Sequence, residues 1–161
     1  MATVTVSFTP LPAHVRTARF VAASVARRAG VADSLLDEIR LAVSEACSLA
    51  VRFHLAHAPA EPVHVRLTDS SNQFTIEVAD AVARPALDLG SDVTLDLDAD
   101  LDLDFEADGM DADGHAGSDT TDFDLRSHER IGLAVINGLV DDVSVGYQED
   151  GSVVTMRWPI A

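Results

Sequence analysis

Residues 36–51 read LDEIRLAVSEACSLAV. Leu, Ile, Val and Ala recur there at three- and four-residue spacing, which predicts a helix over residues 33–54 that buries one face. One carboxylate, Glu45, interrupts the apolar pattern, and Leu49 follows one turn later on the same face. Taken alone, Glu45 is most simply interpreted as a solvated helix carboxylate.

The segments on either side complete an α/β pattern. Alternating β-branched residues predict strands, and apolar residues at helical spacing predict helices. Their order favours a two-layer α/β (α+β) sandwich, with helices on a mainly antiparallel sheet. At 161 residues, a single domain over 1–161 is expected. The expected elements are a strand at 3–8, a helix at 14–29 that Gly30 ends, the helix at 33–54 with Asp33 or Ser34 as N-cap, strands at 63–68 and 73–79 around a turn at 69–72, a helix at 129–143, and a hairpin at 143–160 that turns at 149–151.

A long acidic segment separates the first hairpin from the last helix. From Asp88 to Asp124 the chain has 14 acidic residues and neither Arg nor Lys, so the remainder carries 13 acids against 11 Arg. Dense like charge opposes packing, and residues 86–127 are therefore predicted to be a disordered insertion. A calcium loop could begin at Asp104, but its twelfth position is His115 instead of a bidentate Glu. We expect this segment to influence partner association by charge.

Composition and charge exclude several classes of protein. The formal net charge is −16 and no basic cluster occurs, which argues against direct binding of nucleic acid. The single cysteine, Cys47, excludes an intrachain disulfide. No targeting segment and no membrane-spanning run is evident in the sequence. We therefore expect a soluble, cytoplasmic protein.

Three segments, in order and at sensible distances, resemble the GHKL (Bergerat-fold) ATPase family. They are LDEIRLAVSEACSLAV, the strand that ends in VAD at Asp80, and IGLAVINGLVDDVSV followed by GSVVTMRWPI. Within that family the chain is most similar to the bacterial anti-sigma factor/serine-protein kinase branch (SpoIIAB/RsbW-like). The resemblance covers nearly the whole chain outside the acidic segment. It implies a histidine-kinase-like ATPase fold.

The family's helix motif places a Glu and, four residues later, an Asn beside the nucleotide. In such enzymes the Glu is the general base, and the Asn holds the Mg²⁺ that bridges the phosphates. The resemblance assigns these positions to Glu45 and Leu49. Because Mg²⁺ requires hard oxygen ligands, which a leucine lacks, we expect no metal site here and an idle Glu45.

The other two motifs are also altered. The family's adenine-binding Asp corresponds to Asp80, but Val82 and Arg84 occupy the positions of two glycines that let the backbone approach the nucleotide. A glycine-rich entry to the last helix receives phosphates in the family. In this chain Arg130 replaces its first glycine and Gly132 remains. Asp80, Arg130 and Gly132 are thus the residual nucleotide-binding residues that the resemblance implies.

The altered motifs predict a pseudo-ATPase that needs no cofactor, and the resemblance implies that it acts as an anti-sigma factor in transcription regulation. It would sequester a sigma factor, and an anti-anti-sigma antagonist would release it by partner switching. The resemblance places docking at Arg19, with Arg16 beside it; the alternative is that such an Arg only covers apolar surface. Two other functions stay open. One is an active serine kinase that uses ATP and Mg²⁺ on an anti-anti-sigma factor, and the other is a scaffold that pairs with an intact relative. Homodimerisation is typical of the resembled branch.

Overall fold

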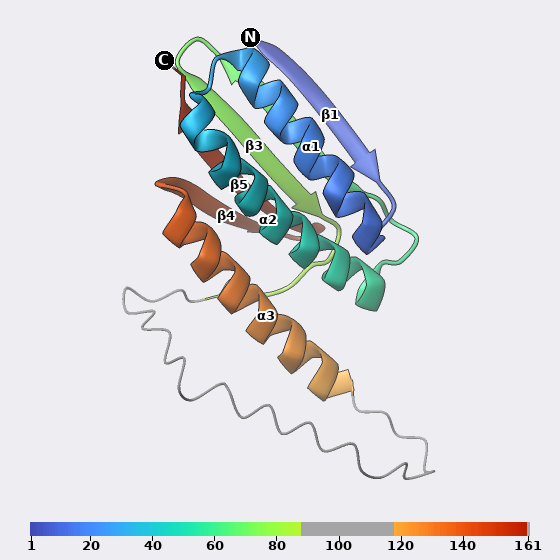
Figure 1. Cartoon of the computed structure of the whole chain (residues 1–161). Helices are drawn as coiled ribbons and strands as arrows, with labels where there is room; N and C mark the ends of the chain where they lie inside the picture. Colours follow the sequence, from blue (N-terminus) through green and yellow to red (C-terminus); the bar gives the residue numbers. More distant parts are fainter. Residues whose placement is uncertain (88–117, 161) are drawn as a thin grey trace.

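Five antiparallel strands form one sheet, and the helices cover one of its faces (Figure 1). The computed structural model describes residues 1–87 and 118–160. The strands lie in the order β1-β2-β3-β5-β4, so β1 and β4 are the two edges. The elements are β1 (Ala2–Phe8), α1 (Pro12–Ala29), a 3₁₀ turn η1 (Asp33–Leu35), α2 (Leu36–His57), β2 (Val63–Ser70), β3 (Gln73–Asp80), α3 (Ser118–Leu139), β4 (Asp142–Gln148) and β5 (Gly151–Pro159). The predicted helix-on-sheet sandwich is confirmed.

Alternation along the central strands places the core between the sheet and the helices. Buried residues alternate with more exposed ones over residues 63–67 of β2, 74–78 of β3 and 152–158 of β5. Cross-strand partners on the buried face are apolar, as where Ile76 lies opposite both Leu67 and Met156. The helices add small side chains to this core, and these allow close approach of helix and sheet. The buried residues of α1 are Ala18, Ala22, Ala23 and Ala26.

The end of α1 follows the predicted glycine signal. Gly30 has φ 96°, a left-handed conformation that glycine adopts without steric cost. Its N–H donates to the carbonyl of Arg27, and the N–H of Val31 donates to the carbonyl of Ala26. These bonds satisfy carbonyls at the end of the helix and turn the chain toward α2.

Helix α3 differs most from the prediction, because it begins at Ser118 and ends at Leu139. Residues 118–127 were assigned to the disordered insertion, and that assignment is wrong for this part. The buried Leu125 and Glu129 continue the spacing of Leu133 and Ile136 toward the start of the helix. The remainder of the predicted insertion, residues 88–117, lies outside the described residues, as does the Asp104–His115 loop.

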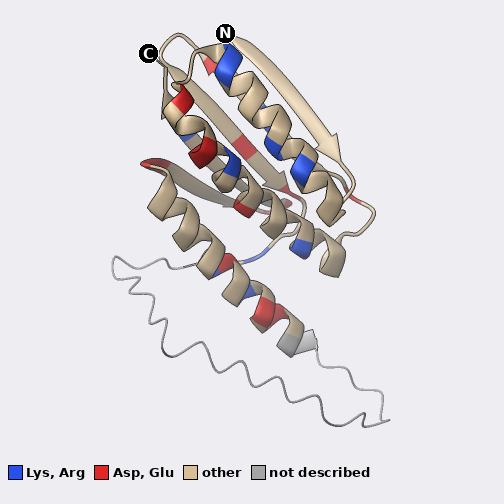
Figure 2. Ribbon diagram, in the orientation of Figure 1, with Lys and Arg blue, Asp and Glu red and all other residues tan. Residues whose placement is uncertain are grey.

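Smaller corrections concern a cap and two turns. Neither Asp33 nor Ser34 forms the expected side-chain cap, because both lie in the 3₁₀ turn that leads into α2. The first hairpin turns at residues 71–72, and the last at 149–150. None of the described helices is long and apolar enough to cross a membrane. Basic and acidic residues of the described part are spread over the helices and the polar positions of the strands (Figure 2).

Candidate functional site

A buried polar site forms where β3 ends and β5 begins. Asp80, the last residue of β3, is the cross-strand partner of Ser152 on β5. The Ser152 hydroxyl donates a 2.7 Å hydrogen bond to Asp80 Oδ2. The two strands approach so closely that a Cβ on Gly151 would lie 1.9 Å from the carbonyl oxygen of Asp80. The backbone thus fixes the carboxylate at the inner end of the strand.

The guanidinium of Arg84 occupies both oxygens of that carboxylate. Its terminal nitrogens lie 2.9 Å from Asp80 Oδ1 and 3.0 Å from Asp80 Oδ2. It also donates to Glu129 Oε1 at 3.1 Å, to Ser152 Oγ at 2.8 Å and to the carbonyl of Val82 at 2.9 Å. This bidentate, charge-assisted arrangement is the strongest common type of ion pair. The side chains of Arg84, Asp80 and Glu129 are only 9%, 6% and 2% exposed.

Two aromatic rings and a second arginine complete the network. The guanidinium carbon of Arg84 lies 3.8 Å from the centroid of the Phe53 ring, a close cation–π contact. Glu129 also accepts from Arg126 at 2.7 Å and from the Tyr147 hydroxyl at 2.9 Å. Two buried carboxylates are therefore balanced by two guanidiniums.

The pKa values of the network follow from this balance. Burial lowers the pKa of Arg84, but the hydrogen bonds and charges of Asp80 and Glu129 outweigh it, and the net shift is upward. Burial, followed by the hydrogen bond to Glu129, raises the pKa of Tyr147 to about 12. Arg84 therefore stays charged and Tyr147 stays neutral at physiological pH, so the contacts described above persist.

Helices α2 and α3 pack directly against each other through Leu49 and Gly132. Leu49 is 7% exposed, and a Cβ on Gly132 would lie 2.8 Å from its Cδ1 atom. A side chain at position 132 would therefore require Leu49 to shift. The two helices are antiparallel, since the contact between His57 and Asp122 lies farther along α2 but earlier along α3. No space remains between the helices at this point.

The family of the chain is shown by comparison with known protein families. The model of the histidine kinase-like ATPase domain matches residues 8–158, which is nearly the entire chain. The chain belongs to the histidine kinase-like ATPase domain family. A search of curated proteins gives no match. The family match agrees with the observed sandwich of helices on an antiparallel sheet.

The helix start that the family resemblance predicts at residues 130–132, where phosphate would bind, does not lie at the start of α3. Gly132 lies fourteen residues after Ser118, the first residue of α3, and so belongs to the interior of the helix. Its N–H is used within the helix, because interior amides donate to the carbonyl four residues earlier. Arg130 is exposed, and no described carboxylate pairs with it. The prediction that residues 130–132 form a helix entry is therefore wrong.

Of the remaining motif positions, Val82 is joined to the network through its backbone, because its N–H donates to Asp80 Oδ1 and its carbonyl accepts from Arg84. Glu45 is half-buried on α2 and makes no hydrogen bond or ion pair with a described side chain. Val82 is buried against Phe53 and Leu125. Among described residues outside glycine, none has a positive φ, so Val82 does not strain the backbone at the expected glycine position. Within the same residues, no three His, Cys, Asp or Glu side chains gather in a way that could hold a metal ion.

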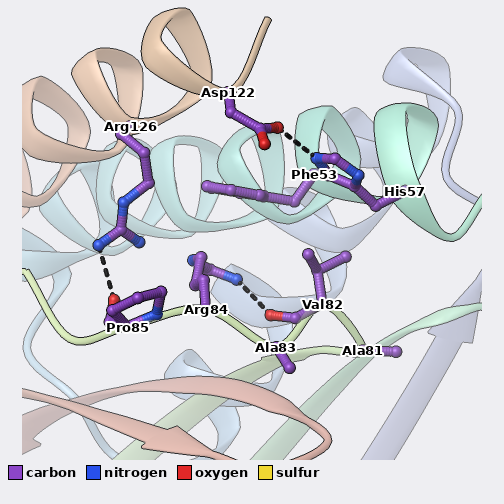
Figure 3. Close-up of a pocket in the computed structure, with 9 residues that line it drawn as sticks. All are labelled: Phe53, His57, Ala81, Val82, Ala83, Arg84, Pro85, Asp122 and Arg126. Carbon is purple, nitrogen blue, oxygen red and sulfur yellow. Dashed lines mark hydrogen bonds and ion pairs between the residues drawn. The ribbon is translucent and has the colours of Figure 1, made fainter. Parts of the chain in front are cut away.

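A cavity of about 500 Å³ lies beside the network, between α2, the segment after β3 and α3 (Figure 3). His57 and Asp122 meet across one side, with 2.8 Å between Nε2 and Oδ1. The two guanidiniums in its wall, those of Arg84 and Arg126, both pair with Glu129. Its positive groups are thus already neutralised by the protein.

Sequence reasoning singled out Asp80 but missed the residues around it. Ser152, Tyr147 and Phe53 come from three different elements, and nothing in their local patterns marks them as polar or aromatic partners of Asp80. Glu129 did carry a signal, because it is an acid at the helical spacing of buried leucines. The predicted docking residues Arg16 and Arg19 lie on α1, outside this network, and are exposed and half-exposed respectively.

Proposed function

We propose that this chain is an anti-sigma regulatory factor that sequesters a sigma factor by protein–protein binding, without binding Mg-ATP or transferring phosphate. The observation that carries the second half of the proposal is the occupation of Asp80 by Arg84. The first half rests on the resemblance of three segments to the anti-sigma branch, within a family that is established for the whole chain.

Competition at Asp80 disfavours a nucleotide. Arg84 donates five hydrogen bonds in the buried network, four of them to Asp80, Glu129 and Ser152. An adenine amino group would have to displace this guanidinium, which would leave Asp80 without a cation and Glu129 with Arg126 alone. Breaking such a buried ion pair typically costs about 3–5 kcal/mol. That amount would reduce the affinity of a nucleotide by two to three orders of magnitude or more.

The metal position gives an independent argument. A productive phosphate site would need an oxygen ligand at position 49 and space between α2 and α3. Leu49 offers neither, since it fills that space against Gly132. The half-buried Glu45 then has no metal or nucleophile to act on. In this proposal the outer surface of the domain binds partners, and an antagonist releases the sigma factor by competition.

Two measurements test the proposal. Isothermal titration calorimetry with Mg-ATP should show no binding at micromolar concentrations, and incubation with radiolabelled ATP and co-purified partner proteins should show no phosphotransfer. Affinity purification of the full chain from its native cells should recover a sigma factor equally with and without ATP. Micromolar nucleotide binding with phosphotransfer would establish the serine kinase instead. Recovery of an intact family relative without a sigma factor would favour the scaffold.

A gain-of-function variant provides the matched control for the nucleotide assay. Arg84→Gly combined with Leu49→Asn restores the glycine and the metal ligand that the family motif contains. Measurable Mg-ATP binding by this variant, but not by the wild type, would attribute the loss to these two side chains.

A further inference from the structure

The groove between the outer faces of α1 and α2 is the strongest candidate for a second functional surface. It has a volume of about 460 Å³ and lies on the side of the two helices that faces away from the sheet. Val15 of α1 and Val51 of α2 form an apolar floor, and Leu55, which is 50% exposed, lies at one end. The full lining is Pro12, Val15, Arg16, Arg19, Ser44, Ser48, Val51, Arg52 and Leu55.

The rim of the groove is basic in a strongly acidic protein. Arg16 and Arg19 lie on the α1 side and Arg52 on the α2 side, and none of the described residues in the lining is acidic. Six of the 11 arginines form ion pairs with described carboxylates, but these three do not. Three of the five arginines without such a partner thus converge on one groove.

A further feature is typical of a protein-binding surface. Phe20, which is 50% exposed, lies beside the groove with the guanidinium carbons of Arg16 and Arg19 at 5.7 and 5.5 Å from its ring centroid. Exposed aromatic and Arg side chains are enriched at protein interfaces.

We propose that this groove binds an acidic amphipathic helix of a partner protein. From Ser44 to Leu55 the α2 wall is about 16 Å long, which corresponds to about three turns of helix. Apolar side chains spaced at i, i+3 and i+7 would enter the floor between Val15 and Val51, as in other helix-in-groove complexes. Carboxylates on the flanks of that helix would pair with the three rim arginines. This inference rests on the proposed function, and it specifies the kind of partner segment that the chain would bind: an acidic amphipathic helix.

Fluorescence anisotropy tests the groove directly. The probe is a labelled synthetic peptide of twelve residues that a side-chain cross-link holds helical, with Leu at i, i+3, i+4 and i+7 and Glu at the other free positions. It is compared with the same peptide carrying Lys in place of Glu, at about 0.15 M salt, where the net negative charge of the protein is screened beyond about 8 Å. The full-length wild type should bind the acidic peptide at least tenfold more tightly than the basic one. No preference, or no binding by the wild type, overturns the proposal.

Charge reversal locates the binding surface. Arg19→Glu combined with Arg52→Glu should weaken the acidic peptide at least tenfold. Arg28→Glu is the matched control, because Arg28 is an exposed arginine of α1 that has no described ion pair and lies outside the groove. It should change affinity less than twofold. Equal losses in both variants overturn the proposal, as does an oligonucleotide of equal charge that binds the wild type as tightly as the peptide.

Two comparisons separate the alternatives. Deletion of residues 88–117 should leave peptide affinity within twofold; a gain of tenfold or more would identify the chain's own acidic segment as the occupant and overturn a partner helix. Sigma-factor recovery by the Arg19→Glu/Arg52→Glu variant distinguishes this inference from the proposed function. Undiminished recovery would refute the groove alone. Arg-dependent peptide binding without any sigma factor in the wild-type purification would refute the proposed function alone.

Discussion

Replacement of Arg84 by alanine should destabilise the protein far more than an ordinary loss of an ion pair. The variant leaves Asp80 and Glu129 buried, at 6% and 2% side-chain exposure, without the cation between them. Asp80 would keep bonds from Ser152 and from the N–H of Val82, and Glu129 would keep Arg126 and Tyr147. Because one charge of a balanced buried set is removed, we expect a loss of about 3–5 kcal/mol in the free energy of unfolding.

Urea denaturation at pH 7, followed by the fluorescence of the single tryptophan, Trp158, measures this loss. For a chain of this length the corresponding fall in Tm is roughly 6–20 °C. Arg157→Ala is the matched control, since Arg157 forms a single 3.1 Å ion pair with Asp142, which is 56% exposed. Such a surface pair contributes about 1 kcal/mol or less. Equal losses for Arg84→Ala and Arg157→Ala would refute the view that Arg84 neutralises a buried site.

A double-mutant cycle then isolates the coupling. Asp80→Ala/Arg84→Ala removes both partners, and should cost less than the sum of the single variants by about 2 kcal/mol or more. Additive losses would mean that Arg84 acts through its contact with Phe53 and not through Asp80.

Three further predictions concern the helices. Gly132→Ala should destabilise the protein by about 1–3 kcal/mol, because its Cβ would lie 2.8 Å from Leu49 Cδ1, and this loss should vanish in a Leu49→Ala background; a persistent loss would contradict the contact. Gly138→Ala, on the same helix but with nothing within 4 Å of its Cβ, should instead stabilise by up to about 1 kcal/mol in thermal unfolding. Burial raises the pKa of Cys47 from 9.0 to about 12, so the thiol loses its proton in the unfolded state at a lower pH than in the folded state. The contribution of this thiol to the free energy of unfolding is fully present below pH 9, and it should fall by about 4 kcal/mol as the pH rises to 12. Cys47→Ala should show a smaller alkaline loss in denaturation measured from pH 8 to 11, and an identical slope would contradict the assignment.

The fold was predictable because its signals are local. The alternation in β2 and β3 follows from Val63, Val65 and Leu67 on one strand and from Phe74, Ile76 and Val78 on the next, and each pattern is complete within eight residues. Gly30 likewise acts through its own backbone. The start of α3 was missed for the opposite reason. The sequence there is acidic and polar, and the burial of Leu125 and Glu129 depends on other elements of the fold.

The site was predictable only in part because its decisive contacts are tertiary. The end of a strand marked Asp80, and the family pattern marked Leu49 and Arg84. The sequence indicated what these residues replace, but not what their side chains contact. Arg84 was interpreted as a lost glycine, whereas its guanidinium joins β3, β5 and α3 through Asp80, Ser152 and Glu129. No local pattern contains that information, since Ser152 lies 68 residues from Arg84.

In the proposed function, Leu49 and Arg84 do more than remove the motif residues that the resemblance implies: Leu49 fills space between two helices, and Arg84 neutralises two buried carboxylates. A glycine at 84 with Asp80 and Glu129 still present would leave two buried carboxylates facing each other with Arg126 as their only described guanidinium. That arrangement is unfavourable unless a ligand supplies the missing donors. Arg84 supplies them from within the chain, and Leu49 fills the space between α2 and α3 beside Gly132. It follows that reversion at 84 alone should yield an unstable domain, while reversion at both positions should make stability depend on added Mg-ATP. A domain that stays folded without a ligand can bind its partner at any nucleotide concentration, as the proposed function requires.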